Sequence, residues 1–264
     1  NWSHAMEFKE DRPLYRFAEI VAALRAPGGC PWDRKQTHES LRPYLIEEAY
    51  EALDAIDSGD PAHIKEELGD VLLQIYLHAE IARERGDFSI DDVAQGIIDK
   101  IILRHPHVFG DATVKDAGQV VERWEEIKKK EKPHRESILD GVPNHLPALL
   151  RAYRVQQKVS RVGFDWEKIG DVAGKLDEEV GELKQAIETG DTKHIVEEGG
   201  DMLFSITNLL RFIEVNPEEA LLKTIAKFTK RFRHIEKRAA ETGKNLEDMS
   251  IGEMEKLWQE AKKM

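Results

Sequence analysis

Two groups of acidic residues recur in the chain with the same spacing. In each group three glutamates fall close together, and after an interval of the same length come a glutamate and an aspartate three positions apart. The first group is Glu47, Glu48, Glu51, Glu67 and Asp70, and the second is Glu178, Glu179, Glu182, Glu198 and Asp201. Convergent carboxylates are typical ligands of Mg²⁺, which keeps waters and substrate phosphates in its remaining positions. The spacing therefore predicts a magnesium site and a ligand that carries phosphate.

Helices are the elements that would position these acids. At about 100° per residue, Glu48 and Glu51 lie about 100° and 40° from Glu47, so one helix face carries all three carboxylates. The second pair of acids borders the segment 68–77, which is apolar almost all round and is expected to be largely buried. Carboxylates crowded there need protons or a cation as compensation. Short turns at 57–60 and 188–191, each with a glycine, predict two antiparallel helices per group.

The acidic groups belong to a duplication of half the chain. The segment 47–72 aligns with 178–203 without a gap, and more than half of the aligned positions are identical. Two flanking pairs, each spaced by four, recur as well: Lys100 and Arg104 as Lys227 and Arg231, and Trp124 and Lys128 as Trp258 and Lys262. We expect two domains, 7–132 and 148–264, joined by a proline-containing linker at 133–147.

Composition sets the broad class. Strand signals are scarce and apolar residues follow helical spacing, which predicts an all-α fold of duplicated helical bundles. The net charge of −12 repels nucleic acid and anionic membranes, so neither is expected as a partner. The single cysteine, the lack of a long apolar stretch and the lack of a secretion signal favour the cytoplasm. Residues 1–5, just before Met6, have the character of an added tag.

Glycine and histidine also recur at matched positions. Gly69 and Gly200 interrupt the second helix of each group, which favours either close approach of a ligand to the backbone or tight helix packing. His63 and His194 lie near the start of the same helices, without a second histidine at ligand spacing. Surface or capping roles are the simpler interpretation of both histidines.

Other classes of protein fit less well. Any one of these glutamates alone would be a solvated surface residue, but both copies keep all five acids while their neighbours change. A di-iron bundle needs Glu-x-x-His on core helices, whereas the match Glu131 to His134 lies beside prolines. The P-loop motif GxxxxGK[ST] is absent. The serious alternative is a regulatory bundle that binds a nucleotide or a protein without turnover.

The motifs together resemble the MazG family of all-α nucleoside triphosphate pyrophosphohydrolases, and especially its two-domain bacterial members. The pattern EExxE, followed at the same interval by ExxD, carries the resemblance in both halves. Supporting segments are 29–33 (GCPWD), 36–38 (QTH), 104–109 (RHPHVF) and 162–166 (VGFDW). The resemblance covers nearly the whole chain from about Tyr15 onward.

The resemblance implies hydrolysis of a nucleoside triphosphate to the monophosphate and pyrophosphate. It implies dependence on Mg²⁺, for which Mn²⁺ is a possible substitute, and a helical bundle completed by a second subunit, although pairing of the two repeats within one chain stays open. By analogy, Glu47 and Glu178 orient or deprotonate the attacking water. The metal ligands are then Glu48, Glu51, Glu67, Asp70, Glu179, Glu182, Glu198 and Asp201. The substrate-binding residues are Lys100, Arg104, Trp124, Lys128, Lys227, Arg231, Trp258 and Lys262.

The two halves are expected to be unequal. The segment 154–166 has no obvious counterpart in the first copy, where 27–31 (PGGCP) occupies the approach to the motif. We therefore expect the second domain to be the more competent catalyst and the first to be a site of different preference or mainly structural. Asp165 and Trp166 are candidates for contacts with the base.

Overall fold

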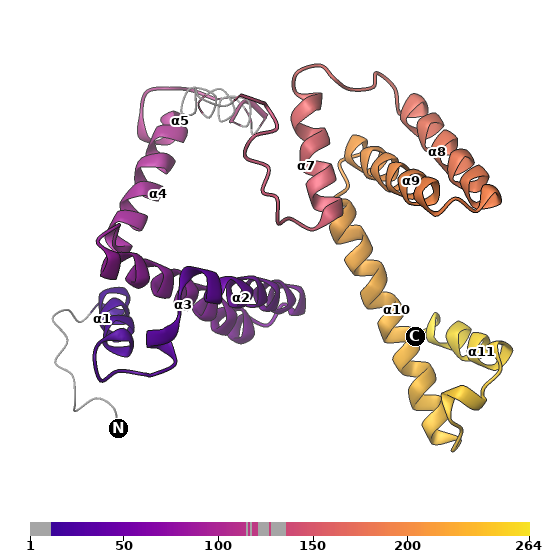
Figure 1. Cartoon of the computed structure of the whole chain (residues 1–264), viewed down its shortest axis with the longest axis horizontal. Coiled ribbons are helices and arrows are strands. Elements are labelled where there is room, and N and C mark those ends of the chain that lie inside the picture. Colours follow the sequence, from indigo (N-terminus) through magenta and orange to yellow (C-terminus); the bar gives the residue numbers. More distant parts are fainter. Residues whose placement is uncertain (1–11, 115, 117, 121–126, 128–135) are drawn as a thin grey trace. The chain divides into compact units, whose positions relative to one another are not determined.

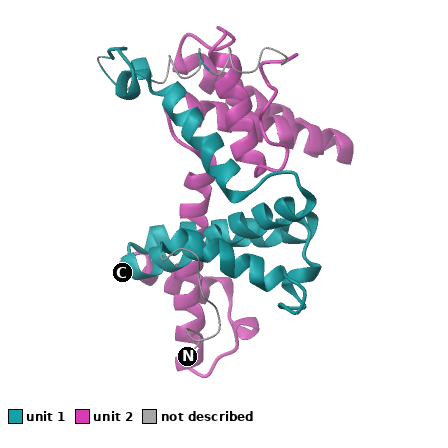
Figure 2. Ribbon diagram, turned by 90° about the vertical axis from the view of Figure 1, so that its left-hand side faces the viewer, with its two compact units in different colours: residues 1–133 teal, residues 134–264 magenta. Residues whose placement is uncertain are grey.

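The computed structural model describes residues 12–114, 116, 118–120, 127 and 136–264, and every regular element in those residues is a helix (Figure 1). The predicted all-α fold is therefore confirmed. The chain divides into two compact units, residues 1–133 and 134–264, which Figure 2 colours separately. The division falls at the start of the expected linker, and the finer domain boundaries stay predictions.

The first unit is built on a helical hairpin. Its described elements are α1 (Pro13–Arg25), the 3-10 helix η2 (Asp33–Lys35), α2 (His38–Ser58), α3 (Pro61–Arg85), α4 (Ile90–Arg104) and α5 (Pro106–Phe109). Helices α2 and α3 pack along each other, and α1 lies against α3. Val21, Leu41 and Leu77 meet in the core of this unit, so α1 covers the inner face of the hairpin.

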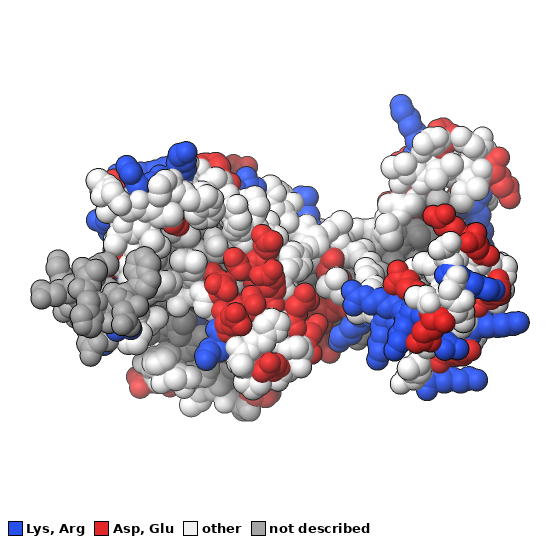
Figure 3. Space-filling view, turned by 90° about the horizontal axis from the view of Figure 1, so that it is seen from below, with Lys and Arg blue, Asp and Glu red and all other residues white. Residues whose placement is uncertain are grey.

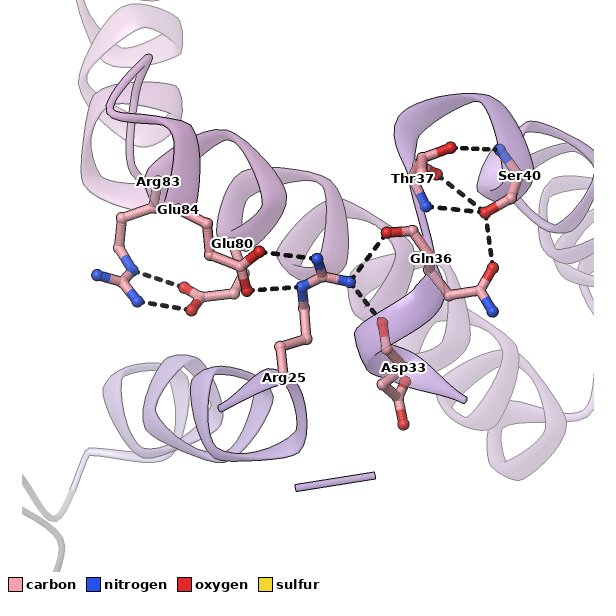
Figure 4. Close-up of polar contacts among 8 residues, drawn as sticks. All are labelled: Arg25, Asp33, Gln36, Thr37, Ser40, Glu80, Arg83 and Glu84. Atoms are coloured by element: carbon pink, nitrogen blue, oxygen red, sulfur yellow. Dashed lines mark hydrogen bonds and ion pairs between the residues drawn. The ribbon is translucent and has the colours of Figure 1, made fainter. Parts of the chain in front are cut away.

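A polar network ties α1 to the hairpin (Figure 4). The Arg25 guanidinium, buried at 9% exposure, donates to both carboxylate oxygens of Glu84 on α3, at 2.9 and 2.8 Å. It also donates to the backbone oxygens of Asp33 and Gln36, which lie just before α2. Thr37 then begins α2 through a reciprocal capping box with Ser40. The network thus fixes where α2, the helix of the first three acids, begins.

The second unit repeats the hairpin and extends it. Its elements are α7 (Ala148–Ser160), α8 (Ile169–Thr189), α9 (Thr192–Phe212), α10 (Pro217–Glu241), the 3-10 helix η3 (Leu246–Asp248) and α11 (Ile251–Ala261). Helices α8 and α9 form the hairpin, α7 packs against α9, and α11 packs against α10. The second copy of the acids is therefore held on the same pair of elements as the first.

The turns of both hairpins follow the sequence prediction. Gly59 and Gly190 end α2 and α8 with φ of +70° and +72°, a left-handed conformation that glycine adopts without steric cost. Asp60 and Asp191 follow directly and cap α3 and α9 by accepting backbone N–H bonds. The predicted antiparallel helix pairs are confirmed.

The expected burial of 68–77 is wrong for part of the segment, since three of its ten residues are exposed. Tyr76 and Leu77 are buried against α1, but Leu68 is 52% exposed and Ile75 is 39% exposed. In the second unit, Leu203 on α9 is likewise 51% exposed. Apolar residues of α3 and α9 therefore lie on two faces of the helix. The described helices of the same unit cover only one of these two faces.

Gly69 and Gly200 are not explained by packing within a unit. A Cβ added to either residue meets no described atom within 4 Å. Tight helix packing within a unit, one form of the packing interpretation of these glycines, is thereby excluded for the part of the chain that the structure describes. None of the described helices is long and apolar enough to cross a membrane.

Candidate active and metal-binding site

The first hairpin brings three of its five acids together. Glu48 on α2 and Glu67 and Asp70 on α3 each offer a carboxylate oxygen, and these oxygens all lie within 4.8 Å of one another. All three side chains are half-buried, whereas Glu47 and Glu51 are not part of this group. Figure 3 shows acidic side chains gathered in a dense patch on the first unit. Oxygen ligands at this separation suit a hard divalent cation.

The second hairpin makes a similar group with a different membership. Glu179 and Glu182 on α8 and Glu198 on α9 offer oxygens within 4.8 Å of one another. Glu179 is only 5% exposed, which makes it more buried than any acid of the first group. Asp201 is exposed and lines a cavity beside Glu179. Six of the eight expected metal ligands thus lie in two groups of three. Glu51 and Asp201 belong to neither group.

One glutamate of each group has a raised pKa. Partial burial, followed by the charges of Asp70 and Glu51, raises the pKa of the Glu48 carboxyl. Desolvation, followed by the charges of Glu179 and Glu198, raises the pKa of Glu182. In each case the charged form is disfavoured by lost hydration and by neighbouring carboxylates. A bound divalent cation would reverse this shift, so the residues fit a metal of that class.

Lys175 neutralises part of the second group, and the sequence analysis did not find it. Its ammonium lies 2.8 Å from Glu178 and 2.8 Å from Glu179. These two contacts raise the pKa of Lys175 far above its ordinary value. The available signal was a lysine four positions before Glu179, at the spacing of a helical ion pair. The alignment of the two copies places Tyr44 at the corresponding position of the first, so the two groups differ in cationic support.

The recurring histidines contact the acids. His63 Nε2 lies 3.3 Å from a Glu67 oxygen, and His194 Nε2 lies 3.0 Å from a Glu198 oxygen. Both histidine side chains are partly exposed, as a surface role requires, but the helix caps are Asp60 and Asp191 rather than the histidines. The signal was the shared His-x-x-x-Glu spacing, which places each histidine over one metal-ligand candidate.

A cavity of about 600 Å³ opens beside the second acidic group. Glu179, Asp201 and Lys175 are among the residues that line it, together with apolar and polar side chains from α7, α9 and the segment before α8. Asp165 and Trp166, the candidates for base contacts, are among the lining residues. The carboxylates therefore adjoin a space that could hold an organic group attached to a phosphate.

The expected substrate cations lie on other helices. Lys100 and Arg104 are on α4, and Lys227 and Arg231 are on α10. The Arg231 guanidinium lies 5.4 Å from the ring centroid of Trp258 on α11, so one expected cation and one expected aromatic residue do meet. Lys262 follows directly after α11. Trp124 and Lys128 lie outside the described residues.

Comparison with known proteins agrees with this arrangement. Residues 36–109 and 171–236 both match the MazG nucleotide pyrophosphohydrolase domain, so the match falls on each hairpin in turn. The chain belongs to the MazG family. The predicted family, its all-α fold and an enzyme that acts as a nucleotide pyrophosphohydrolase are thereby confirmed.

Curated relatives resemble the chain over most of its length. It is 50% identical over 244 residues to the nucleoside triphosphate pyrophosphohydrolase/pyrophosphatase MazG of Thermotoga maritima, covering 92% of this chain and 93% of that protein. It is 40% identical over 255 residues to the nucleoside triphosphate pyrophosphohydrolase of Escherichia coli, covering 94% and 96%. It is also 50% identical over 260 residues to the uncharacterized Bacillus subtilis protein YabN, covering 96% of this chain and 53% of that protein.

Proposed function

We propose that this enzyme hydrolyses ribo- or deoxyribonucleoside triphosphates to the monophosphate and pyrophosphate, with Mg²⁺ as the metal and Mn²⁺ as a substitute. The observation that carries the proposal is the convergence of Glu179, Glu182 and Glu198 beside a cavity with room for a nucleoside. The names of the Thermotoga and Escherichia relatives support the reaction class. A role in clearing unwanted nucleotides or in controlling nucleotide levels under stress fits this chemistry.

The acidic, basic and aromatic residues of the site are proposed to have different roles in the reaction. The convergent carboxylates would hold the cation, which would supply positive charge to polarise phosphate oxygens and offset the charge that develops during attack. Glu178 and Glu47 are the candidates to orient a water and accept its proton. Lys175 lies between Glu178 and Glu179 and balances their charge. Lys227, Arg231 and Lys262, with Lys100, Arg104 and Lys128, are proposed to hold the triphosphate, and Trp258 and Trp124 to cover the nucleoside.

The second unit is proposed to be the more active one. The alignment of the two copies matches Asn208, which lines the cavity, with Leu77, which is 2% exposed in the core of the first unit. The same alignment matches Lys175 with Tyr44. The second acidic group therefore has a polar amide and an ammonium nearby for contacts with a nucleotide, where the first copy has an apolar and an aromatic side chain.

A homodimer in the cytoplasm is the proposed state. Apolar residues of α4 and α10 are between 42% and 56% exposed, so the described residues of their own units leave long apolar surfaces uncovered: Ile97, Ile98, Ile101, Ile102, Leu103, Leu221, Leu222, Ile225 and Phe228. Surfaces of this kind mark interaction sites. Free Cys30 and the nucleotide substrates fit a reducing compartment.

The reaction class is tested by product analysis. The purified protein is incubated with each common nucleoside triphosphate and Mg²⁺, and the products are separated by chromatography. We expect monophosphate with pyrophosphate, lost on chelation and reduced at least about 100-fold in Glu182→Gln, because one ligand of the charge-stabilising cation is gone. Diphosphate with free phosphate would mean that a different bond breaks, and the absence of turnover with nucleotide binding intact would favour a regulatory bundle.

A further inference from the structure

Two histidines meet across the first hairpin. His38 is the first residue of α2, and His78 lies in the second half of α3. Their Nδ1 atoms are 2.8 Å apart, and the two rings are within 4° of parallel. Both side chains are half-buried, and His78 Nε2 is buried without a hydrogen-bond partner among the described residues. The proposed function gives this pair no role.

The pair lies at the open end of the hairpin. Gly59 and Asp60 join α2 to α3 at the other end. Glu48, Glu67 and Asp70 lie between this turn and the two histidines along the chain. Because like-charged carboxylates repel each other, contacts on both sides of the acidic group keep the two helices together. The turn provides one of these contacts and the histidine pair provides the other.

The contact between the two Nδ1 atoms needs one proton. A neutral imidazole carries its proton on one ring nitrogen, so one Nδ1 donates and the other accepts. A first added proton can enter at Nε2 of the donating ring and leaves the bond in place. A second added proton must go to the accepting Nδ1, which makes both Nδ1 atoms donors and places two positive charges side by side. The doubly protonated pair therefore separates.

The surroundings of His78 disfavour its charged form. Burial, followed by the charge of His38, lowers the pKa of His78. Charged groups with defined contacts come from every helix packed against α3: Arg25 of α1 with Glu84, Glu39 of α2 with Arg85 and His38, Asp92 of α4 with Ser89 and, on α3 itself, Glu80 with Arg83. A lowered pKa contributes stability that is fully present above the pKa of an unfolded histidine, about 6.5, and is lost as pH falls through the folded value.

The second copy lacks the pair. The alignment of the two copies places Ile169 and Leu209 at the positions of His38 and His78. Helices α8 and α9 begin at the residues that match the first residues of α2 and α3, so the alignment holds over both hairpins. Neither Ile169 nor Leu209 can take up a proton. The second hairpin is therefore an internal control for the first.

We propose that the His38–His78 pair is a pH-sensitive latch of the first unit. With one proton between the Nδ1 atoms, the latch joins the start of α2 to α3. With a second proton it opens and releases the start of α2. The inference does not depend on which reaction the enzyme catalyses.

Hydrogen–deuterium exchange of the whole protein tests the latch. The protein is kept in EDTA at about pH 7.5 and about pH 5.0, on either side of the histidine range, and the rates are corrected for intrinsic exchange. We expect residues 38–46 of α2 to lose at least about 10-fold in protection at the lower pH, the factor that one unit of pKa shift gives. Residues 169–177 of α8 should lose less than about threefold.

Two variants show whether the pair is responsible. The double variant His38→Ile, His78→Leu has the side chains of the second copy and should lose the dependence on pH. His63→Gln removes a histidine of the same hairpin that lies outside the pair and should keep it. Equal loss of protection in both hairpins, or an unchanged loss in the double variant, would overturn the latch.

Nitrogen-15 NMR of labelled histidine rings is a second measurement, for which the unaltered enzyme suffices. At about pH 7.5 one ring of the pair should carry its proton on Nδ1, and on acidification the two rings should take up protons in separate steps. Two rings protonated only on Nε2 at this pH would overturn the proposal. If the double variant does not fold, this titration decides the question.

Discussion

Glu182 shows how strongly the second acidic group depends on a cation. Its pKa is raised by desolvation and by Glu179 and Glu198, so folding favours its protonated form. A raised pKa contributes stability below the pKa of the unfolded chain and loses it as pH rises through the folded value. Without metal, the group therefore destabilises the protein at neutral pH.

This dependence predicts a pH-sensitive melting temperature. In EDTA, the Tm of Glu182→Gln relative to that of the unaltered enzyme should rise as pH is raised from about 4 to 7, because the neutral amide does not acquire charge. Saturating Mg²⁺ should remove the advantage of the variant at pH 7. Glu197→Gln, an exposed acid beside Glu198, is the control. The same pH slope in both variants and the unaltered enzyme would falsify the electrostatic account.

Lys175 competes with the metal for the carboxylates. Its ammonium contacts Glu178 and Glu179, and the latter belongs to the group of three converging acids. Removing this charge in Lys175→Met should strengthen Mn²⁺ binding by about 3- to 10-fold, a modest gain because solvent screens a partly exposed ammonium. Titration of Mn²⁺ by electron paramagnetic resonance measures the change. Weaker binding in the variant would show instead that Lys175 positions Glu179.

At the scale of elements, the second helix of each hairpin contains a glycine that helix packing within its unit does not require. Gly200 lies within α9, and an added Cβ meets nothing within 4 Å. Gly200→Ala should therefore raise the stability by about 1 kcal/mol through helix propensity, or Tm by about 2–4 °C. We expect activity to fall at least about 10-fold, on the interpretation that Gly200 leaves room for close approach of a ligand to the backbone.

Gly174→Ala on α8 is the matched variant for this prediction. An added Cβ at Gly174 also meets nothing within 4 Å, so a similar gain in stability is expected. Its activity should stay within about twofold of the unaltered enzyme. Thermal melts and pyrophosphate release on both variants are the measurements, and full activity of Gly200→Ala would show that the open space has no role in catalysis.

The sequence predicts best what is local within the hairpins. The spacing of the acids, the glycine turns at Gly59 and Gly190 and the helix pairs depend on neighbours close in the chain, and the structure confirms the turns and pairs. The hydrogen bond from Gln156 to the Phe204 backbone depends on α7 packing against α9, a contact between residues 48 positions apart, so the sequence has no local signal for it. Burial of Leu68 was predicted wrongly because hydropathy does not say whether the covering surface belongs to the same unit.

At the scale of the whole molecule, uncovered apolar surfaces favour assembly. Leu222, Ile225 and Phe228 follow helical spacing on α10 and are about half exposed. Replacing Ile225 and Phe228 by glutamate should convert the proposed dimer to a monomer, because burial of two charges in an apolar interface is strongly unfavourable. Sedimentation velocity reports the mass, with Glu255→Gln as a surface control. An unaltered enzyme that sediments as a monomer would favour pairing of the two repeats within one chain.

The proposed dimer also determines which chain supplies the cations. Arg231 lies with Trp258 where α10 meets α11, whereas the acids that contact Lys175 and His194 lie on α8 and α9. If Arg231 of one subunit serves the acids of the other, a mixture of Glu182→Gln and Arg231→Ala chains forms heterodimers with one intact site. Random pairing should then restore about a quarter of the normal activity from two inactive variants, because half of the dimers are mixed and each has one of two sites.

The mixing experiment separates two arrangements. Cations acting on the acids of their own chain leave every site of the heterodimer damaged, so activity would stay at the level of the separate variants. The chains are unfolded and refolded together, and pyrophosphate release is measured against each variant refolded alone. Recovery in the mixture but not in either separate sample would place the cations of α10 across the dimer interface, which would account for apolar residues and substrate-binding residues sharing one helix.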